Sequence, residues 1–358
     1  MALIEIDGSV GEGGGQVIRT SVALATLLGK KIHIFNIRAK RSLKGLQPQH
    51  ITGVKAVAAL AEAEVEGLSL GSTELTFEPR TRLSGNFAFD VGTAGSISLV
   101  LQALMLAAAF TPGVVKLGVT GGTDVRWSPT IDYVKYVALP VLKKMDYEAT
   151  MAFTRRGHYP RGGGKVSMIV HPLRSLKPIN LTDFGEAKRI GGVSHCVRLP
   201  KEVAERQAKA ATVVLEKEGY RDVDILTESY PPDKDPHLGP GSGVLLYAET
   251  TSGAVLGADA LGERGKPAEK VGKEAADKLL KELKSRMPID RHMGDMLIPY
   301  MAVADGYSMV NVSEVSMHLL TNVQITDLIA GTKFKVEGEL KSPGKVHVKG
   351  LGLMNVAQ

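Results

Sequence analysis

Residues 13–37 read GGGQVIRTSVALATLLGKKIHIFNI, and this stretch sets the pattern from which the fold can be predicted. Glycines precede an apolar helix predicted over Val17–Leu28, and a β-branched strand predicted over Lys31–Ile37 follows it. The unit continues with a helix over Gln49–Glu62 and strands near Ala63–Glu66 and Glu74–Glu78. Its order is therefore helix, strand, helix, strand, strand.

The same order recurs from Thr93 and again from about Met293, so the chain contains three repeats. Residues 183–278, between the second and third repeats, have a different texture, with polar loops and a long amphipathic helix. They are predicted to form a small α/β domain inserted at an exposed loop. The expected fold class is α/β (α+β). Its large domain is built from residues 1–182, with repeats one and two, and 279–358, with the third repeat.

The composition is that of a folded protein with a mild preference for polyanions. The 358 residues are 44% apolar and 23% charged, with a net charge of +6. The single Cys196 excludes a disulfide framework or a multi-cysteine metal site. No secretory signal is readable at the start, and the longest apolar run, Ile97–Phe110, is too short to span a bilayer. We therefore expect a cytoplasmic protein with no membrane contact.

Glycine is the most unusual feature of the composition, with 40 residues gathered in clusters. Gly11–Gln16 follows a strand and opens a helix, a geometry suited to binding an anion such as phosphate. Glu12 stands among cations and could hold a divalent metal while they bind phosphate oxygens. These cations are Arg19, Arg38, Lys40, Arg41 and Lys44. A tight structural turn and a solvated basic loop are the alternatives.

The second repeat carries further glycine clusters at equivalent places, Gly92–Ser96 and Gly121–Asp124. Gln102 interrupts an apolar helix, which indicates either packing at an edge or contact with a ligand. The string Arg156–Val166 combines consecutive glycines with arginine, histidine and tyrosine, so it could contact phosphate and stack on bases. A purely structural hairpin remains open for it. The basic helix face bearing Lys270, Lys273, Lys278, Lys281 and Lys284 is expected to be solvated surface rather than an RNA track.

His318 is the candidate nucleophile among the nine histidines. It is predicted in the first turn of a helix, where the helix dipole favours the neutral imidazole. A neutral imidazole beside bound phosphates can attack phosphorus. The alternative is a histidine satisfied by the helix start. His50 takes the same place in the first repeat and Thr130 in the second, so His50 is an internal control, whereas His195 is expected to need no special role.

Taken together, these motifs resemble those of the RNA 3′-terminal phosphate cyclase family. The similarity rests on the string Arg156–Val166 as the family signature. Asp7-Gly8 with Gly11–Gln16, then Arg19, Gly121–Asp124 and His318–Asn322 match the family in order along the chain. It covers essentially the whole chain, through about residue 340. The resemblance implies a large domain of three βαβαββ units with a smaller α/β insert, in agreement with the repeats.

The resemblance also implies an ATP-dependent ligase. Its histidine, here His318, is adenylylated, AMP passes to the 3′-phosphate of an RNA, and the vicinal 2′-hydroxyl closes a 2′,3′-cyclic phosphate as AMP leaves. By position, Glu12 would bind the divalent metal, Mg²⁺ or Mn²⁺. Arg19, Arg38, Arg41 and Gln49 would line phosphates, Gln102 and Asp295 would lie near the nucleotide, and Pro129 and His292 would sandwich the adenine. Some relatives carry tyrosine at the position of His292.

Two other functions compete with this one. The first is a non-catalytic, cyclase-like RNA-binding protein of ribosome biogenesis, against which the presence of His318 argues. The second is an enolpyruvyl transferase, which has related repeats but does not explain a motif centred on histidine. The sequence leaves both a monomer and a homodimer open.

Overall fold

The protein is built around three copies of one sheet topology, seen in a computed structural model that describes residues 3–356. The first unit comprises β1 (Ile4–Asp7), α1 (Gly15–Leu28), β2 (Ile32–Phe35), α2 (Pro48–Ala61), β3 (Glu64–Glu66) and β4 (Leu75–Glu78). Its sheet has the order β1-β2-β4-β3, in which β1 and β2 are parallel and the other neighbours antiparallel.

The second and third units repeat this order. The second comprises β5 (Gly85–Asp90), α3 (Ile97–Ala108), β6 (Val115–Gly121), α4 (Ile131–Tyr133), η1 (Val134–Ala138), α5 (Leu139–Lys143), β7 (Ala149–Arg155) and β8 (Gly164–Val170). The third comprises β9 (Asn180–Leu181), α8 (Arg291–Val303), β14 (Tyr307–Val312), α9 (Met317–Ala330), β15 (Lys335–Glu337) and β16 (Gly344–Lys349). Their sheets run β5-β6-β8-β7 and β9-β14-β16-β15, again with the first pair parallel. The α/β class with repeated units is therefore confirmed.

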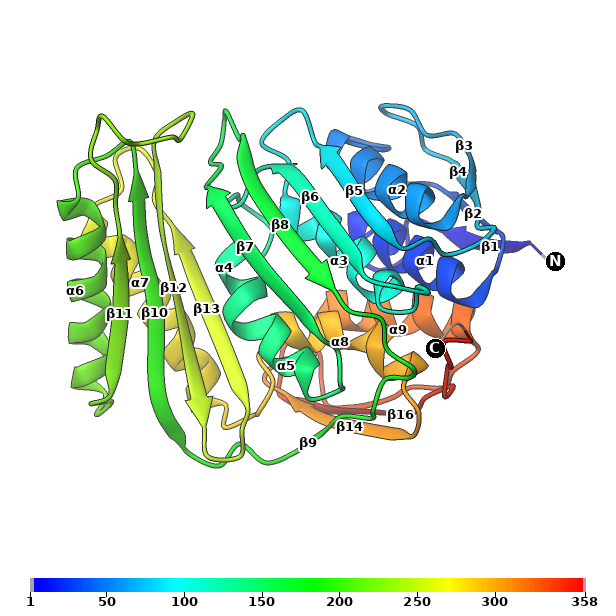
Figure 1. The fold of residues 1–358 in the computed structure, drawn as a ribbon. Coiled ribbons are helices and arrows are strands. Elements are labelled where there is room, and N and C mark those ends of the chain that lie inside the picture. The colour runs from blue at the N-terminus through cyan, green and yellow to red at the C-terminus, as the bar shows by residue number, and fades with distance from the viewer. Residues whose placement is uncertain (1–2, 357–358) are drawn as a thin grey trace.

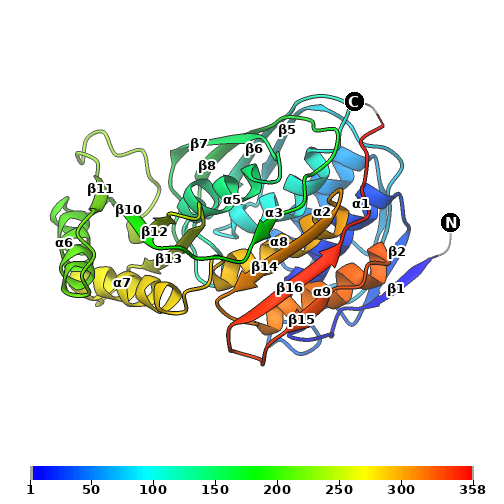
Figure 2. The same ribbon diagram turned by 90° about the horizontal axis from the view of Figure 1, so that it is seen from below.

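The helices of the three units meet in the middle of the molecule and the sheets lie outside them (Figures 1 and 2). Helix α1 packs against α2, α3 and α9, and α8 packs against α9. Helix α3 is buried on nearly all sides, which explains its almost unbroken apolar sequence. One apolar core runs through all three units. The packing of α1 on α9 brings the start of the chain beside its last repeat.

A separate sheet with two helices is inserted in the chain of the third unit, between β9 and α8. It comprises β10 (Ala187–Val197), α6 (Glu202–Lys217), β11 (Val223–Glu228), β12 (Gly241–Thr250), β13 (Val255–Leu261) and α7 (Ala268–Lys284). Its sheet has the order β11-β10-β12-β13, helices α6 and α7 lie on the outer side of it, and it has a core of its own (Figure 1). Each unit and the insert therefore contributes a distinct sheet.

Residues 131–143, the second helical segment of the second unit, do not form one regular α-helix. A π-helical turn, η1, separates α4 from α5, and Pro140 lies at the start of α5. Proline has no backbone N–H to donate, and a widened turn accommodates its ring. Three strands, β5, β9 and β13, were absent from the sequence-based prediction.

Candidate active site

His318 lies in the first turn of α9, where two units of the fold meet. Ser316 caps the helix, because its hydroxyl accepts the N–H of Leu319 at 2.9 Å. Gln16 of α1 donates from Nε2 to the carbonyl oxygen of His318 at 2.8 Å. These contacts fix the backbone at His318. The side chain remains 43% exposed, so a ligand can reach the imidazole.

Glu12 joins His318 to the basic loop. Its Oε1 lies 3.3 Å from Nδ1 of His318, and its Oε2 accepts from Arg41 at 3.0 Å. Gly11, at φ +59°, allows this approach, because a Cβ there would lie 2.0 Å from the hydroxyl of Thr321. A carboxylate facing Nδ1 favours the tautomer that carries its proton there and leaves the Nε2 lone pair free.

The surroundings keep the imidazole of His318 neutral. Burial lowers its pKa below the usual value, the cations Arg19 and Arg41 lower it further, and the Glu12 carboxylate opposes them. Burial also lowers the pKa of Arg19 to about 10. Within residues 3–356, the Arg19 side chain forms no hydrogen bond or ion pair, so its guanidinium is free to bind an anion.

Asp295 of α8 lies behind the start of α9. The Ser316 hydroxyl donates to its Oδ1 at 2.5 Å, and Asn322 donates to its backbone oxygen at 2.7 Å. Burial raises the pKa of its carboxyl to about 7. His292, one turn earlier on α8, is exposed and meets the ring of Tyr133 edge-on at 6.0 Å between centroids.

Gln49 and Pro129, both predicted nucleotide contacts, belong to one hydrogen-bonded chain. Gln49 accepts the N–H of Ser96 at 3.1 Å, the Ser96 and Ser98 hydroxyls are 2.8 Å apart, and Ser98 donates to the carbonyl oxygen of Pro129 at 2.6 Å. Gln102 follows Ser98 by four residues on α3, where it is half-buried. Its side chain forms no hydrogen bond with other described residues.

The structure therefore separates the predicted site residues into groups. Glu12 contacts both Arg41 and His318. Arg38 instead donates to the carbonyl oxygen of Leu43 at 3.0 and 3.2 Å. In the described chain no hydrogen bond or ion pair connects His318 to Arg38, Gln49, Gln102 or Pro129.

The expected equivalence of three helix-start residues is wrong in detail. His318 is the second residue of α9, His50 is the third residue of α2, and Thr130 is the cap of α4. The loops that enter these helices differ, so matching elements do not place matching residues at one position.

Two regions outside this site bear on function. Sequence reasoning gave His195 no role, yet it lies buried beside Asp124 and His158. Asp124 and His158 lie in glycine-rich motifs that the sequence analysis had marked as candidate functional segments. The sequence around His195 contains no such motif.

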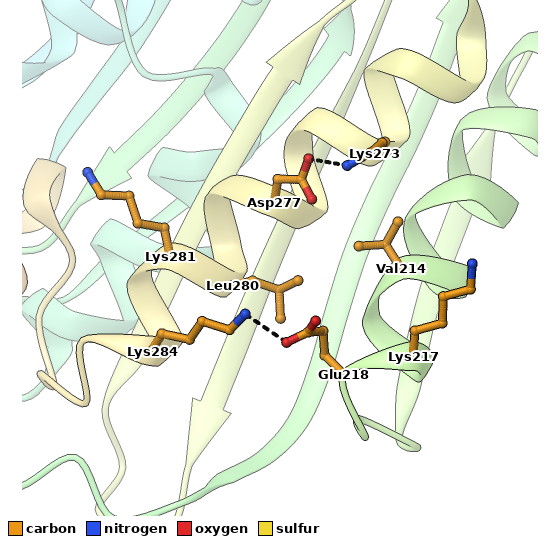
Figure 3. Close-up of a pocket in the computed structure, with 8 residues that line it drawn as sticks. All are labelled: Val214, Lys217, Glu218, Lys273, Asp277, Leu280, Lys281 and Lys284. Carbon is orange, nitrogen blue, oxygen red and sulfur yellow. Dashed lines mark hydrogen bonds and ion pairs between the residues drawn. The ribbon is translucent and has the colours of Figure 1, made fainter.

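The second region is a groove between α6 and α7, drawn in Figure 3. Lys273 pairs with Asp277 at 2.7 Å and Lys284 with Glu218 at 2.7 Å. Lys281 also pairs, with Glu314 at 3.1 Å. Acidic partners thus offset much of the positive charge of these lysines, so the groove is poorly suited to binding the phosphates of an RNA.

Comparison with known proteins identifies the family. Residues 10–336 match the model of the RNA 3′-terminal phosphate cyclase family. The chain belongs to that family. Curated proteins named RNA 3′-terminal phosphate cyclase are 51% identical over 98% of this chain and 99% of their own length in Ignicoccus hospitalis, and 49% identical over 98% and 99% in Methanopyrus kandleri. A relative of the same name in Hyperthermus butylicus is 52% identical over 98% of both chains.

Membership of the cyclase family decides between the cyclase and the enolpyruvyl transferase interpretations of the sequence. It places the chain with enzymes named as cyclases rather than with enolpyruvyl transferases. None of the helices in the described part of the chain has the length and apolar character needed to cross a membrane.

Proposed function

We propose that this protein converts the 3′-terminal phosphate of an RNA to a 2′,3′-cyclic phosphodiester, using ATP and releasing AMP and diphosphate. The single observation that supports it most is the neutral, half-exposed imidazole of His318, with Nδ1 turned to Glu12. The name of the family, and the names of relatives that align with this chain over nearly their whole length, support the same activity.

In the first proposed step, Nε2 of His318 attacks the α-phosphorus of ATP. A nitrogen–phosphorus bond forms, the bond to the β-phosphate bridging oxygen breaks, and diphosphate leaves. The Glu12 carboxylate lies 3.3 Å from Nδ1, so it offsets positive charge as the ring becomes cationic. Arg19 and Arg41 would offset charge on the phosphate oxygens.

In the next steps the adenylyl group serves to activate the RNA end. An oxygen of the 3′-phosphate attacks the adenylyl phosphorus and His318 departs, which produces RNA–adenylate. The 2′-hydroxyl then attacks the RNA phosphorus, and AMP leaves as the ring closes. A phosphate monoester is a poor electrophile for a neighbouring hydroxyl, and its adenylylation supplies a stable leaving group.

A divalent cation fits the donors around Glu12. The Glu12 carboxylate is 36% exposed, and Mg²⁺ in such enzymes takes one or two carboxylates and completes its shell with substrate phosphates and water. Glu12 would therefore hold Mg²⁺ or Mn²⁺, with Arg41 giving up its contact with one carboxylate oxygen. When bound, the ion would neutralise phosphate charge.

The RNA strand could be received by two exposed aromatic side chains. Trp127 is 93% exposed and Tyr159 is 80% exposed. Their loops lie side by side, because Asp124 forms a parallel bridge with His158. Single-stranded RNA stacks its bases on such rings.

Labelled ATP tests the proposal. The protein is incubated with Mg²⁺ and ATP labelled at the α-phosphate, and the denatured protein is examined for an acid-labile, alkali-stable label. We expect a stoichiometric adduct that transfers to an RNA 3′-phosphate and then yields a cyclic end.

Two variants make this assay specific. His318→Ala should form no adduct, and His171→Ala, at an exposed histidine, should form it normally. Cyclised ends accumulating without any protein-bound adenylate would contradict the covalent route. RNA binding with neither product would favour the non-catalytic alternative.

A further inference from the structure

Three ligand-type side chains lie buried together where the second unit meets the insert. Asp124 follows β6, His158 lies in the loop between β7 and β8, and His195 lies in β10. They are 2%, 8% and 1% exposed, respectively. The proposed reaction uses none of them.

The two imidazoles stand at the separation that one metal ion requires. Nε2 of His158 lies 3.3 Å from Nε2 of His195, and ligands about 2.0–2.1 Å from a tetrahedral ion are about 3.3–3.4 Å apart. Asp124 Oδ2 lies 3.9 Å from Nε2 of His195. One ligand atom from each residue lies within 4.8 Å of the others.

The side chains around the cluster carry an excess of negative charge, which would favour binding of a cation. Arg156, 1% exposed, contacts Asp132 at 2.6 Å, Glu228 at 2.7 Å and Asp124 at 3.4 Å. Three carboxylates thus face a single guanidinium, and a divalent cation would supply the two missing charges.

One buried oxygen of the cluster has no partner. Asp124 Oδ1 forms no hydrogen bond within residues 3–356. Buried polar atoms are normally satisfied, so an unpaired one in a cluster of metal-binding side chains indicates a missing ligand. The carboxylate Oδ1 is available for coordination, since Oδ2 already accepts from Thr123 at 2.6 Å.

We propose that Asp124, His158 and His195 bind a divalent transition-metal ion, of which zinc is the first to test. Two imidazoles and a carboxylate are a donor set that zinc and its neighbours prefer, whereas Mg²⁺ prefers oxygen ligands alone. The site is therefore distinct in chemistry from the one that Glu12 would provide.

The ion would clamp the insert to the second unit. The glycine-rich loop at 156–163 contributes His158, and a Cβ at Gly241 of β12 would lie 2.0 Å from that ring. Metal bound here would fix the position of this loop against β10 and β12, and binding only to the folded chain would raise the melting temperature.

Metal content of the full-length protein tests the site. The chain is stripped with chelator, incubated with excess zinc, freed of unbound ion and analysed by elemental mass spectrometry. We expect about one zinc per chain, a raised melting temperature, and a drop of at least about tenfold in bound zinc in His195→Gln and His158→Asn. Glu12→Gln is the matched control and should retain the zinc.

A measurement on the unaltered protein covers the case in which both variants fail to fold. X-ray absorption at the zinc edge should show two imidazole ligands and no sulfur, although Cys196 is adjacent to His195. Absence of stoichiometric zinc in the wild-type chain would overturn the proposal, as would zinc retained equally by folded His195→Gln or a spectrum without imidazole.

Discussion

His318 at the start of α9 and His50 at the start of α2 open corresponding helices of two repeats, yet they have different characters. His50 is 4% exposed, and its Nδ1 accepts the N–H of Gln47 at 3.0 Å. Its ring also packs where a Cβ of Gly15 would lie, 2.2 Å from Nε2. Burial lowers its pKa to about 3, helped by Arg19.

His318 differs because its nitrogens are not used to build the fold. Nδ1 faces the Glu12 carboxylate and the side chain is 43% exposed. Both histidines are neutral at pH 7, so neutrality alone does not make a nucleophile. Access and a proton acceptor at the second nitrogen distinguish them.

Removal of the two imidazoles is expected to give the largest contrast. His318→Ala should lower the rate of protein adenylylation by at least about a thousandfold, because a nucleophile is lost. His50→Ala should retain adenylylation in its folded fraction, because its ring is occupied by the helix start. Single-turnover assays with labelled ATP measure both, and equal loss in folded protein would remove the distinction.

Glu12 is the next point of contrast. Glu12→Gln should lower the adenylylation rate about 10- to 100-fold, since the carboxylate no longer supports the forming imidazolium. The carboxylate raises the pKa of His318, so its loss should move the acid limb of the rate profile to lower pH. A profile that keeps its midpoint would show that Glu12 does not act on the imidazole.

His50 should matter for stability where His318 does not. His50→Ala removes a buried ring and the acceptor for the backbone N–H of Gln47, the N-cap residue of α2, which should cost about 1–3 kcal/mol of unfolding free energy. His318→Ala, at a half-exposed position, should change it by about 0.5 kcal/mol or less. Urea denaturation compares the two. A larger loss in His318→Ala would reverse the assignment.

Asp295 is predicted to have an effect that depends on pH and does not bear on the nucleophile. Its folded pKa of about 7 lies above the usual 3.8, so the fold prefers the protonated carboxyl and loses stability as pH rises from about 4 to about 7. Asp295→Asn keeps an acceptor for Ser316 without the charge. Its melting temperature relative to wild type should rise at pH 8 and change little at pH 4. A shift independent of pH would contradict this.

Much of this molecule could be predicted from local sequence patterns. Apolar periodicity identified the three repeats, and the glycine-rich strings with His318 identified the family. Both signals lie in contiguous residues, whose spacing dictates backbone conformation directly. Strand β13, with the sequence VLGADAL, has a weak local signal and forms because β12 pairs with it. Strand β9, of only two residues, likewise depends on its pairing with β14.

Only the tertiary structure decided which side chains meet. Glu12 and His318 are 306 residues apart in the chain and come together because α1 packs against α9. His195 joins Asp124 and His158 only because the insert docks on the second unit. Amino-acid order determines which helices and strands can form, whereas distances between side chains far apart in the chain depend on how those elements pack, which no local pattern encodes.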